Sequence, residues 1–266
     1  MAIQDEFGRI GFFEDFGGYN ATASIADATA GTRFNDVTLI AVSGAVDFIN
    51  TVDESGGVGS FSGATGAGDG IAIVGLPMQP STNGTIRMGA RFKGASATDL
   101  RVFVGFAETV ALAEPVNPFT LSGATLTSND AGNAVGFYTD TGATDDDFRF
   151  HYSLDGTEST TAPLYSSLSG ATTLGALGIR SQCTITADSW YVARVEIDAG
   201  GGCIGYFGGP GMANQSGLTK VAHMKPGTFD QTALVYPVLY LLAASTGDPL
   251  LECDYIWAKG NRDWAT

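Results

Sequence analysis

Two pairs of acidic residues have a spacing that could support cleavage of a glycosidic bond. Glu196 and Asp198 lie two residues apart in YVARVEID, and Glu252 and Asp254 have the same spacing in LLECDYIW. Alternate residues of a β-strand point to one face, so each pair would project from one side of its strand. Two nearby carboxyl groups can act as acid and nucleophile on a sugar. The ordinary alternative is a solvated strand face, and we expect that alternative for both pairs.

Patterns for metal binding are weak. Three aspartates at 145–147 form an acidic tip five residues after Asp140. Calcium favours oxygen ligands gathered from such loops, but the EF-hand spacing is missing, so we expect a solvated hairpin tip. His151 and His223 stand far apart in the sequence without a zinc motif. We therefore predict no catalytic residue, no metal and no cofactor.

Tryptophans are candidates for stacking on sugars or for contacts between subunits. Trp190 and Trp257 lie inside strong strand patterns, so we expect them to pack in the core. Trp264 lies close to the C-terminus behind AKGNRD, and we predict that it contacts a partner.

The first 35 residues differ from the remainder of the chain. GFFEDF brings Phe12, Phe13 and Phe16 together, and a run of small residues follows. We predict that residues 1–35 form an N-terminal strand or arm whose three phenylalanines dock on a neighbouring subunit. Packing in the protein's own core is the alternative. Residues 36–266 are expected to form one domain.

The elements that must position these residues are β-strands. IRMGARFKG alternates apolar with polar residues, and so does SWYVARVEID, which a glycine turn connects to CIGYFGG. This period of two indicates half-buried antiparallel strands. YPVLYLLAAS is continuously apolar and predicts a strand buried on both faces, whereas residues 111–130 predict a long loop. A hairpin is expected on either side of the acidic tip. The fold predicted is all-β, with two antiparallel sheets packed as a sandwich.

The charge, hydropathy and cysteine content of the chain limit the classes of function that we expect. The net charge is −15, which disfavours direct binding to nucleic acid and to anionic membranes. We find no basic region followed by an apolar core at the N-terminus and no apolar run of membrane-spanning length. Cys183, Cys203 and Cys253 form an odd set without CxxC spacing, so buried thiols are expected, and a Cys183–Cys203 pairing is left open.

Several segments resemble a known superfamily. Trp190-Tyr191 followed by RVEID, a glycine turn and IGYF, together with the terminal CDYIWAKGNR and the opening FFEDF, resembles the concanavalin A-like lectin and glucanase superfamily. The resemblance implies a jelly roll. The middle of the chain, from GGVGSFSG to DDDFRFHY, resembles sandwich proteins of tailed-phage virions. Laminarinase-like enzymes carry an ExDxxE or ExDxE run on one strand, and this sequence has none; Glu108 and Glu114 lack the intervening Asp.

These observations lead to a structural, non-enzymatic function. We predict a virion protein of a tailed phage, made in the host cytoplasm and located on the capsid surface. It would decorate or cement the shell by binding the major capsid protein, and it would form a homo-oligomer. The alternative is a carbohydrate-binding module of a tail or head fibre, which would bind a surface glycan in a groove with exposed aromatic residues on the concave sheet. A laminarinase-type glycoside hydrolase is the third and disfavoured hypothesis.

Overall fold

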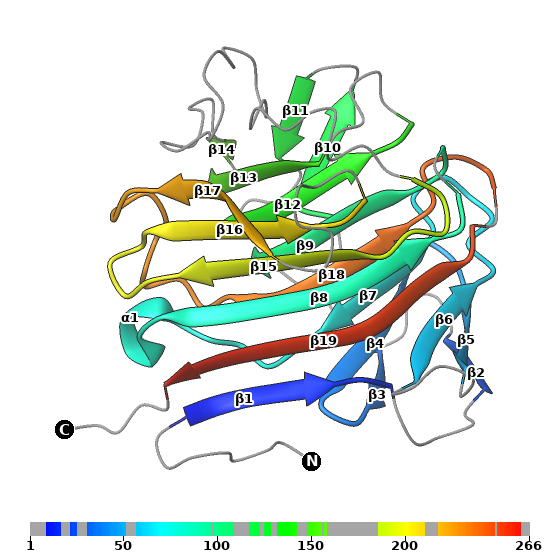
Figure 1. The fold of residues 1–266 in the computed structure, drawn as a ribbon, viewed down its shortest axis with the longest axis horizontal. Coiled ribbons are helices and arrows are strands. Elements are labelled where there is room, and N and C mark those ends of the chain that lie inside the picture. The colour runs from blue at the N-terminus through cyan, green and yellow to red at the C-terminus, as the bar shows by residue number, and fades with distance from the viewer. Residues whose placement is uncertain are drawn as a thin grey trace.

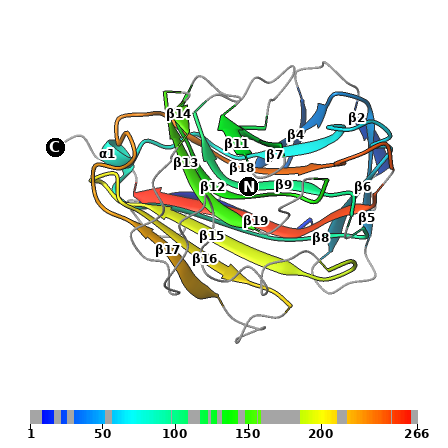
Figure 2. The ribbon, with the colours of Figure 1, turned by 90° about the horizontal axis from the view of Figure 1, so that it is seen from above.

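The structure, a computed structural model, describes residues 9–16, 22–25, 31–51, 57–96, 98–108, 117–122, 125–128, 132–142, 148–155, 157–158, 186–210, 218–247 and 249–261. Over these residues the chain forms nineteen strands and one four-residue helix, α1 (Pro80–Asn83). The strands assemble into two large antiparallel sheets and one separate hairpin. Figure 1 shows the sheets as a front and a back layer, and Figure 2 shows the same two layers from above.

The nine-stranded sheet is the front layer in Figure 1. Its spatial order is β17-β16-β15-β8-β19-β6-β5-β2, and β1 also pairs with β19. Its strands are β1 (Arg9–Glu14), β2 (Thr22–Ile25), β5 (Val46–Thr51), β6 (Val58–Ser62), β8 (Ile86–Gly94), β15 (Tyr191–Ile197), β16 (Cys203–Gly208), β17 (Thr219–Met224) and β19 (Leu251–Asn261).

The eight-stranded sheet lies behind it in the order β14-β13-β12-β9-β18-β7-β4-β3. Its strands are β3 (Thr32–Phe34), β4 (Val37–Val42), β7 (Gly70–Val74), β9 (Arg101–Ala107), β12 (Ala134–Asp140), β13 (Arg149–Leu154), β14 (Thr157–Glu158) and β18 (Tyr236–Leu242). β10 (Phe119–Ser122) and β11 (Thr125–Ser128) pair with each other, so the long loop predicted for 111–130 is wrong over these residues. Their Thr and aromatic residues suit a pleated strand in spite of the polar composition.

The core lies between the two sheets, where the inward side chains of both meet. In β8 the core residues Ile86, Met88, Ala90 and Phe92 alternate with residues of the outer face, as the period of two predicts. β15 alternates in the same way, although its outer-face residue Glu196 is 7% exposed. β18 is buried on both faces, as predicted, because a second apolar cluster that includes Phe119 covers the outer side of the eight-stranded sheet. The architecture is therefore the predicted two-sheet sandwich.

The described part of the N-terminal region belongs to both sheets. β1 pairs with β19, and β3 pairs with β4. Phe12 and Phe16 are 4% and 0% exposed and form part of the core cluster, whereas Phe13 is 48% exposed. Of the three predicted contact residues, Phe13 is thus the one whose ring a partner could reach.

Candidate functional site: the outer face of the nine-stranded sheet

The predicted carboxylate pairs are held by structural partners. Glu252 forms an ion pair with Lys93 at 2.7 Å between Oε2 and Nζ, and Asp254 forms one with Arg91. Glu196 is engaged by two guanidinium groups. Asp198 instead accepts hydrogen bonds from the backbone N–H groups of Gly200 and Gly202, at 2.8 and 2.9 Å, in the turn after β15.

A row of side chains crosses the outer face of this sheet at one register level. Cross-strand pairing places the six residues of this row next to one another on six successive strands, from β17 to β1. The residues are Lys220, Tyr206, Arg194, Gly89, Trp257 and Phe13. Neighbouring strands lie about 4.8 Å apart, so Tyr206 and Trp257, three strands from each other, are separated by roughly 14 Å. We call this set the cross-strand row.

Glycine gives the row a flat platform. A Cβ at Gly89 would lie 2.7 Å from Nε1 of Trp257, so the indole ring rests against the bare backbone of β8. On the far side of Trp257, Phe13 stacks on Tyr255, with ring centroids 5.9 Å apart. Burial raises the pKa of Tyr255, so its hydroxyl stays protonated and can donate a hydrogen bond.

Trp190 and Trp257 contradict the prediction of core packing, because both are half-buried on the outer face. In β19, Leu251 and Cys253 point inward, and an uninterrupted strand would send Trp257 inward as well. A bulge between Cys253 and Tyr255 reverses the alternation, so Ile256 becomes buried and Trp257 turns outward.

Tyr206, Trp257 and Trp190 each have a cation over the ring face. The guanidinium carbon of Arg194 lies 5.0 Å from the centroid of the Tyr206 ring, and Nζ of Lys259 lies 5.6 Å from that of the Trp257 ring. Arg91 and Lys93 approach Trp190 to 4.5 and 4.9 Å. Such contacts hold the rings in fixed positions.

Glu196 ties two of these cations together. It forms ion pairs with Arg194, its neighbour on β15, and with Arg87 on β8, where Nε lies 3.3 Å from Oε1. One carboxylate thus serves two guanidinium groups. The arrangement presents rigid aromatic rings between hydrogen-bonding groups, which is a surface suited to binding rather than to proton transfer.

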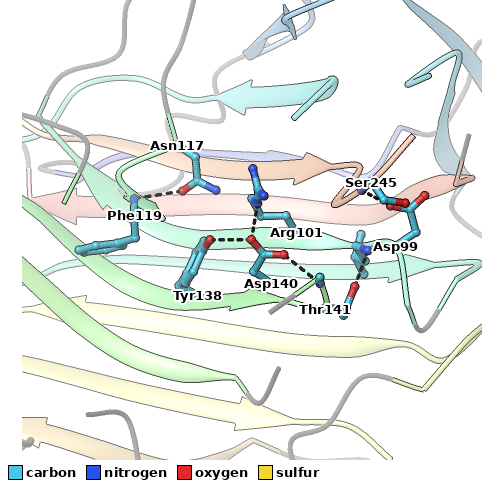
Figure 3. A network of polar contacts seen from close by, with 10 residues as sticks. Asp99, Arg101, Asn117, Phe119, Tyr138, Asp140, Thr141 and Ser245 are labelled. Carbon is cyan, nitrogen blue, oxygen red and sulfur yellow. Dashed lines mark hydrogen bonds and ion pairs between the residues drawn. The ribbon is translucent and has the colours of Figure 1, made fainter. Parts of the chain in front are cut away.

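A second polar cluster lies at the other sheet and is structural (Figure 3). Asp140 accepts a hydrogen bond from Nε of Arg101 at 2.7 Å and another from the N–H of Gly142 at 3.0 Å. Asp99 accepts one from the N–H of Ser245. These carboxylates join loops that are distant in sequence, and Asp140 is 2% exposed. The cluster therefore stabilises the end of the sheet and leaves no carboxylate directed at a ligand.

Other titratable residues are buried. His151 is 3% exposed, and its pKa is lowered to about 3 by burial and by the neighbouring charge of Arg149. Cys203 and Cys253 are free buried thiols whose pKa values burial raises. His223 lies on β17, beside Ile204 of the outer face.

The described ranges lack two features. No group of three or more His, Cys, Asp or Glu side chains in those ranges could hold a metal ion. No helix in them has the length and apolarity needed to cross a membrane. Trp264, Cys183, Glu114 and the aspartates at 145–147 lie outside the described residues.

Sequence reasoning missed Tyr206, Arg194 and Lys259 as members of a site. The sequence contained part of the information, because each of these three residues stands at an outward position of a strand in which apolar and polar residues alternate. What the sequence could not supply was the order of the strands, which brings β16, β15, β8 and β19 side by side.

Comparison with known proteins establishes the fold. No protein-family model matches this sequence, and no curated protein matches it. Among solved structures, a protein of unknown function from Shewanella oneidensis MR-1 matches with a TM-score of 0.52 and 13% identity, over 100% of this chain and 92% of the other.

Two further structures are similar at 10% identity and a TM-score of 0.48 each. Winged bean acidic lectin matches over 95% of this chain and 98% of its own. The CBM2 module of the evolved Dit of Lactobacillus casei BL23 phage J-1 matches over 96% of both chains. The chain is an all-β sandwich of two antiparallel sheets, as predicted. The narrower resemblance to phage virion sandwich proteins stays a prediction.

Proposed function

We propose that this protein is a non-enzymatic carbohydrate-binding domain whose ligand lies along the cross-strand row. One observation carries the proposal: Tyr206 and Trp257 occupy the same row, on the outer face, with Arg194 and a bare glycine between them. Aromatic faces bind the C–H faces of sugar rings by dispersion and burial of apolar surface. The guanidinium group of Arg194 and the hydroxyl group of Tyr206 supply hydrogen-bond donors for the hydroxyl groups of a sugar. This is the alternative that the sequence offered, placed on specific residues.

Rigidity supports binding at this face. The side chains of the row stand on strands, and ion pairs and cation–π contacts restrict their rotamers. A surface that is ordered before the ligand arrives loses less conformational entropy on binding. Sites of this kind on strands are also held more precisely than sites on loops.

Binding measurements with two variants test the proposal. A glycan array should identify a ligand for the wild-type protein, and calorimetry should then give its Kd. Trp257→Ala and Tyr206→Ala should each weaken binding by about 2- to 12-fold, since an aromatic contact contributes about 0.5–1.5 kcal/mol. Leu234→Ala is the control, because Leu234 is 49% exposed and lies outside the sheets. An array without hits would contradict the proposal, and unchanged affinity of both aromatic variants would contradict the face.

Catalysis is tested separately. The carboxylates of this face are ion-paired, so we expect no release of reducing ends when the protein is incubated with a bound polysaccharide. Release that disappears in Glu196→Gln or Glu252→Gln would overturn the non-enzymatic part of the proposal.

Attachment to a phage capsid, expected from the sequence, stays a prediction. Co-sedimentation with expanded capsids tests binding to the major capsid protein, and light scattering tests the homo-oligomer. Phe13→Ser is the informative variant for both, because Phe13 is the exposed phenylalanine of the three predicted contact residues.

A further inference from the structure

The outer face has a charge opposite to that of the chain. The five strands β8, β15, β16, β17 and β19 carry six cationic side chains and three carboxylates. The cations are Arg87, Arg91, Lys93, Arg194, Lys220 and Lys259, and the carboxylates are Glu196, Glu252 and Asp254. This leaves a charge of +3 on a chain whose total is −15. The whole chain has thirteen lysines and arginines among its 266 residues, and six of them, nearly half, lie on these five strands.

Cations lie next to both aromatic rings of the cross-strand row. Arg194 lies over the Tyr206 ring, and Lys220 is the cross-strand neighbour of Tyr206 on the other side. Lys259 lies over the Trp257 ring, two residues along the same strand. A sugar that stacks on either ring must move its cation to the ring edge, where the guanidinium or ammonium group can pair with an acid group of the sugar. Charge-assisted hydrogen bonds of that kind are about twice as strong as neutral ones.

We infer that the ligand of this face is an anionic polysaccharide, whose sugars carry carboxylate, sulfate or phosphate groups; this rests on the proposed carbohydrate-binding function. A local excess of cations in an acidic chain does not help to bind a neutral glycan, whereas it attracts an anionic one. The carboxylates Glu196, Glu252 and Asp254 are paired with cations of this face, so the excess of positive charge is small. A small excess suits the sparser charges of an acidic polysaccharide better than the closely spaced phosphates of DNA.

The test uses polymers that share a backbone and differ in charge. Polygalacturonate and its fully methyl-esterified form are titrated into the protein by calorimetry, at about 20 mM and about 300 mM NaCl, which shortens the range of charge interactions from roughly 20 Å to roughly 6 Å. We expect the acidic form to bind at least about tenfold more tightly at low salt, with most of that difference lost at high salt.

Charge variants locate the effect. Lys220→Gln combined with Lys259→Gln replaces two ammonium groups by neutral amides and keeps all aromatic rings, and both lysines are exposed. The double variant should lose about fivefold in affinity for the acidic polymer, with a smaller salt dependence and no change for the esterified polymer. Lys225→Gln removes one positive charge from an exposed site in the turn after β17 and should bind like the wild type.

The outcomes separate this inference from the proposed function. Equal affinity for the two galacturonans would overturn the anionic preference and leave carbohydrate binding intact. Binding to neither of them, nor to any glycan of a broad array, would overturn both. Equal binding of poly-L-glutamate or oligo-dT would show a general polyanion site and would also overturn the inference.

Discussion

Gly89→Ala tests whether the indole of Trp257 is a binding platform. A methyl group at position 89 would lie 2.7 Å from Nε1 of Trp257 and 2.8 Å from Cε2, where ordinary contacts begin at 3.4 Å. The indole must therefore rise by roughly 0.7 Å or rotate away, because the neighbouring atoms on β8 are backbone and cannot yield easily. The substitution leaves every aromatic and charged side chain of the face in the sequence.

The expected magnitude follows from one lost stacking contact. Such a contact contributes about 0.5–1.5 kcal/mol, so the Kd for the glycan should rise by about 2- to 12-fold. Stability should change little, because Gly89 has no positive φ, and Gly→Ala at such a site gains about 0.4–1 kcal/mol by restricting the unfolded chain. That gain offsets part of the cost of moving the indole.

Calorimetry and urea denaturation measure the two effects on the same sample. Gly142→Ala, in the turn after β12 of the other sheet, is the control: its Cβ would lie 3.3 Å from Oδ1 of Asp140, which requires a shift of only about 0.1 Å. Weaker binding with an unchanged denaturation midpoint would agree with the reasoning. Wild-type affinity in Gly89→Ala, with tryptophan fluorescence also unchanged, would refute it, because the ring would then not rest where the glycine places it.

Three further predictions concern buried groups. The pKa of His151 in the folded protein is about 3, so as the pH falls the unfolded chain binds a proton at this histidine before the folded protein does. The free energy of unfolding should therefore drop by about 3 kcal/mol between pH 6.5 and pH 4. Urea denaturation measures this loss, which should be absent in His151→Leu. Burial raises the pKa of Glu14, which favours its protonated form in the native state; Glu14→Gln should therefore be more stable than wild type at pH 7 but not at pH 3.5, by thermal melting. In a Cys183→Ser background, Cys203 and Cys253 should resist iodoacetamide at pH 8 until denaturant is added, as read by mass spectrometry, and rapid native labelling would contradict their burial.

The two-sheet sandwich could be predicted because its clearest strands can be recognised from the pattern of neighbouring residues in the sequence. β8 and β15 alternate inward apolar residues with outer residues that are mostly polar, and β18 is almost continuously apolar. Such patterns depend only on neighbours in sequence. They identify strands and their inner faces without reference to any partner strand.

The candidate site could not be predicted, because it depends on pairings between distant segments. β8 lies between β15 and β19, both more than ninety residues later in the chain, and nothing local specifies that order. The bulge after Cys253 also could not be predicted from the sequence. Simple alternation along β19 places Trp257 in the core, and the extra residue of the bulge moves Trp257 to the outer face. Trp190, by contrast, directly precedes the inward-facing Tyr191, so strict alternation would have placed it outside.

The pairing of β1 with β19 has a consequence for how this protein is made. Arg9 lies opposite Asn261, so strands from the two extremes of the described chain complete one sheet. A ribosome releases β19 after all the other strands of the described residues. Until then β8 lacks one of its two neighbouring strands, and Phe12 lacks part of the core that surrounds it. Contacts of such long range slow folding and leave an apolar strand edge uncovered meanwhile. Nascent chains halted before Leu251 should therefore remain protease-sensitive and dependent on chaperones, however well their earlier hairpins have formed.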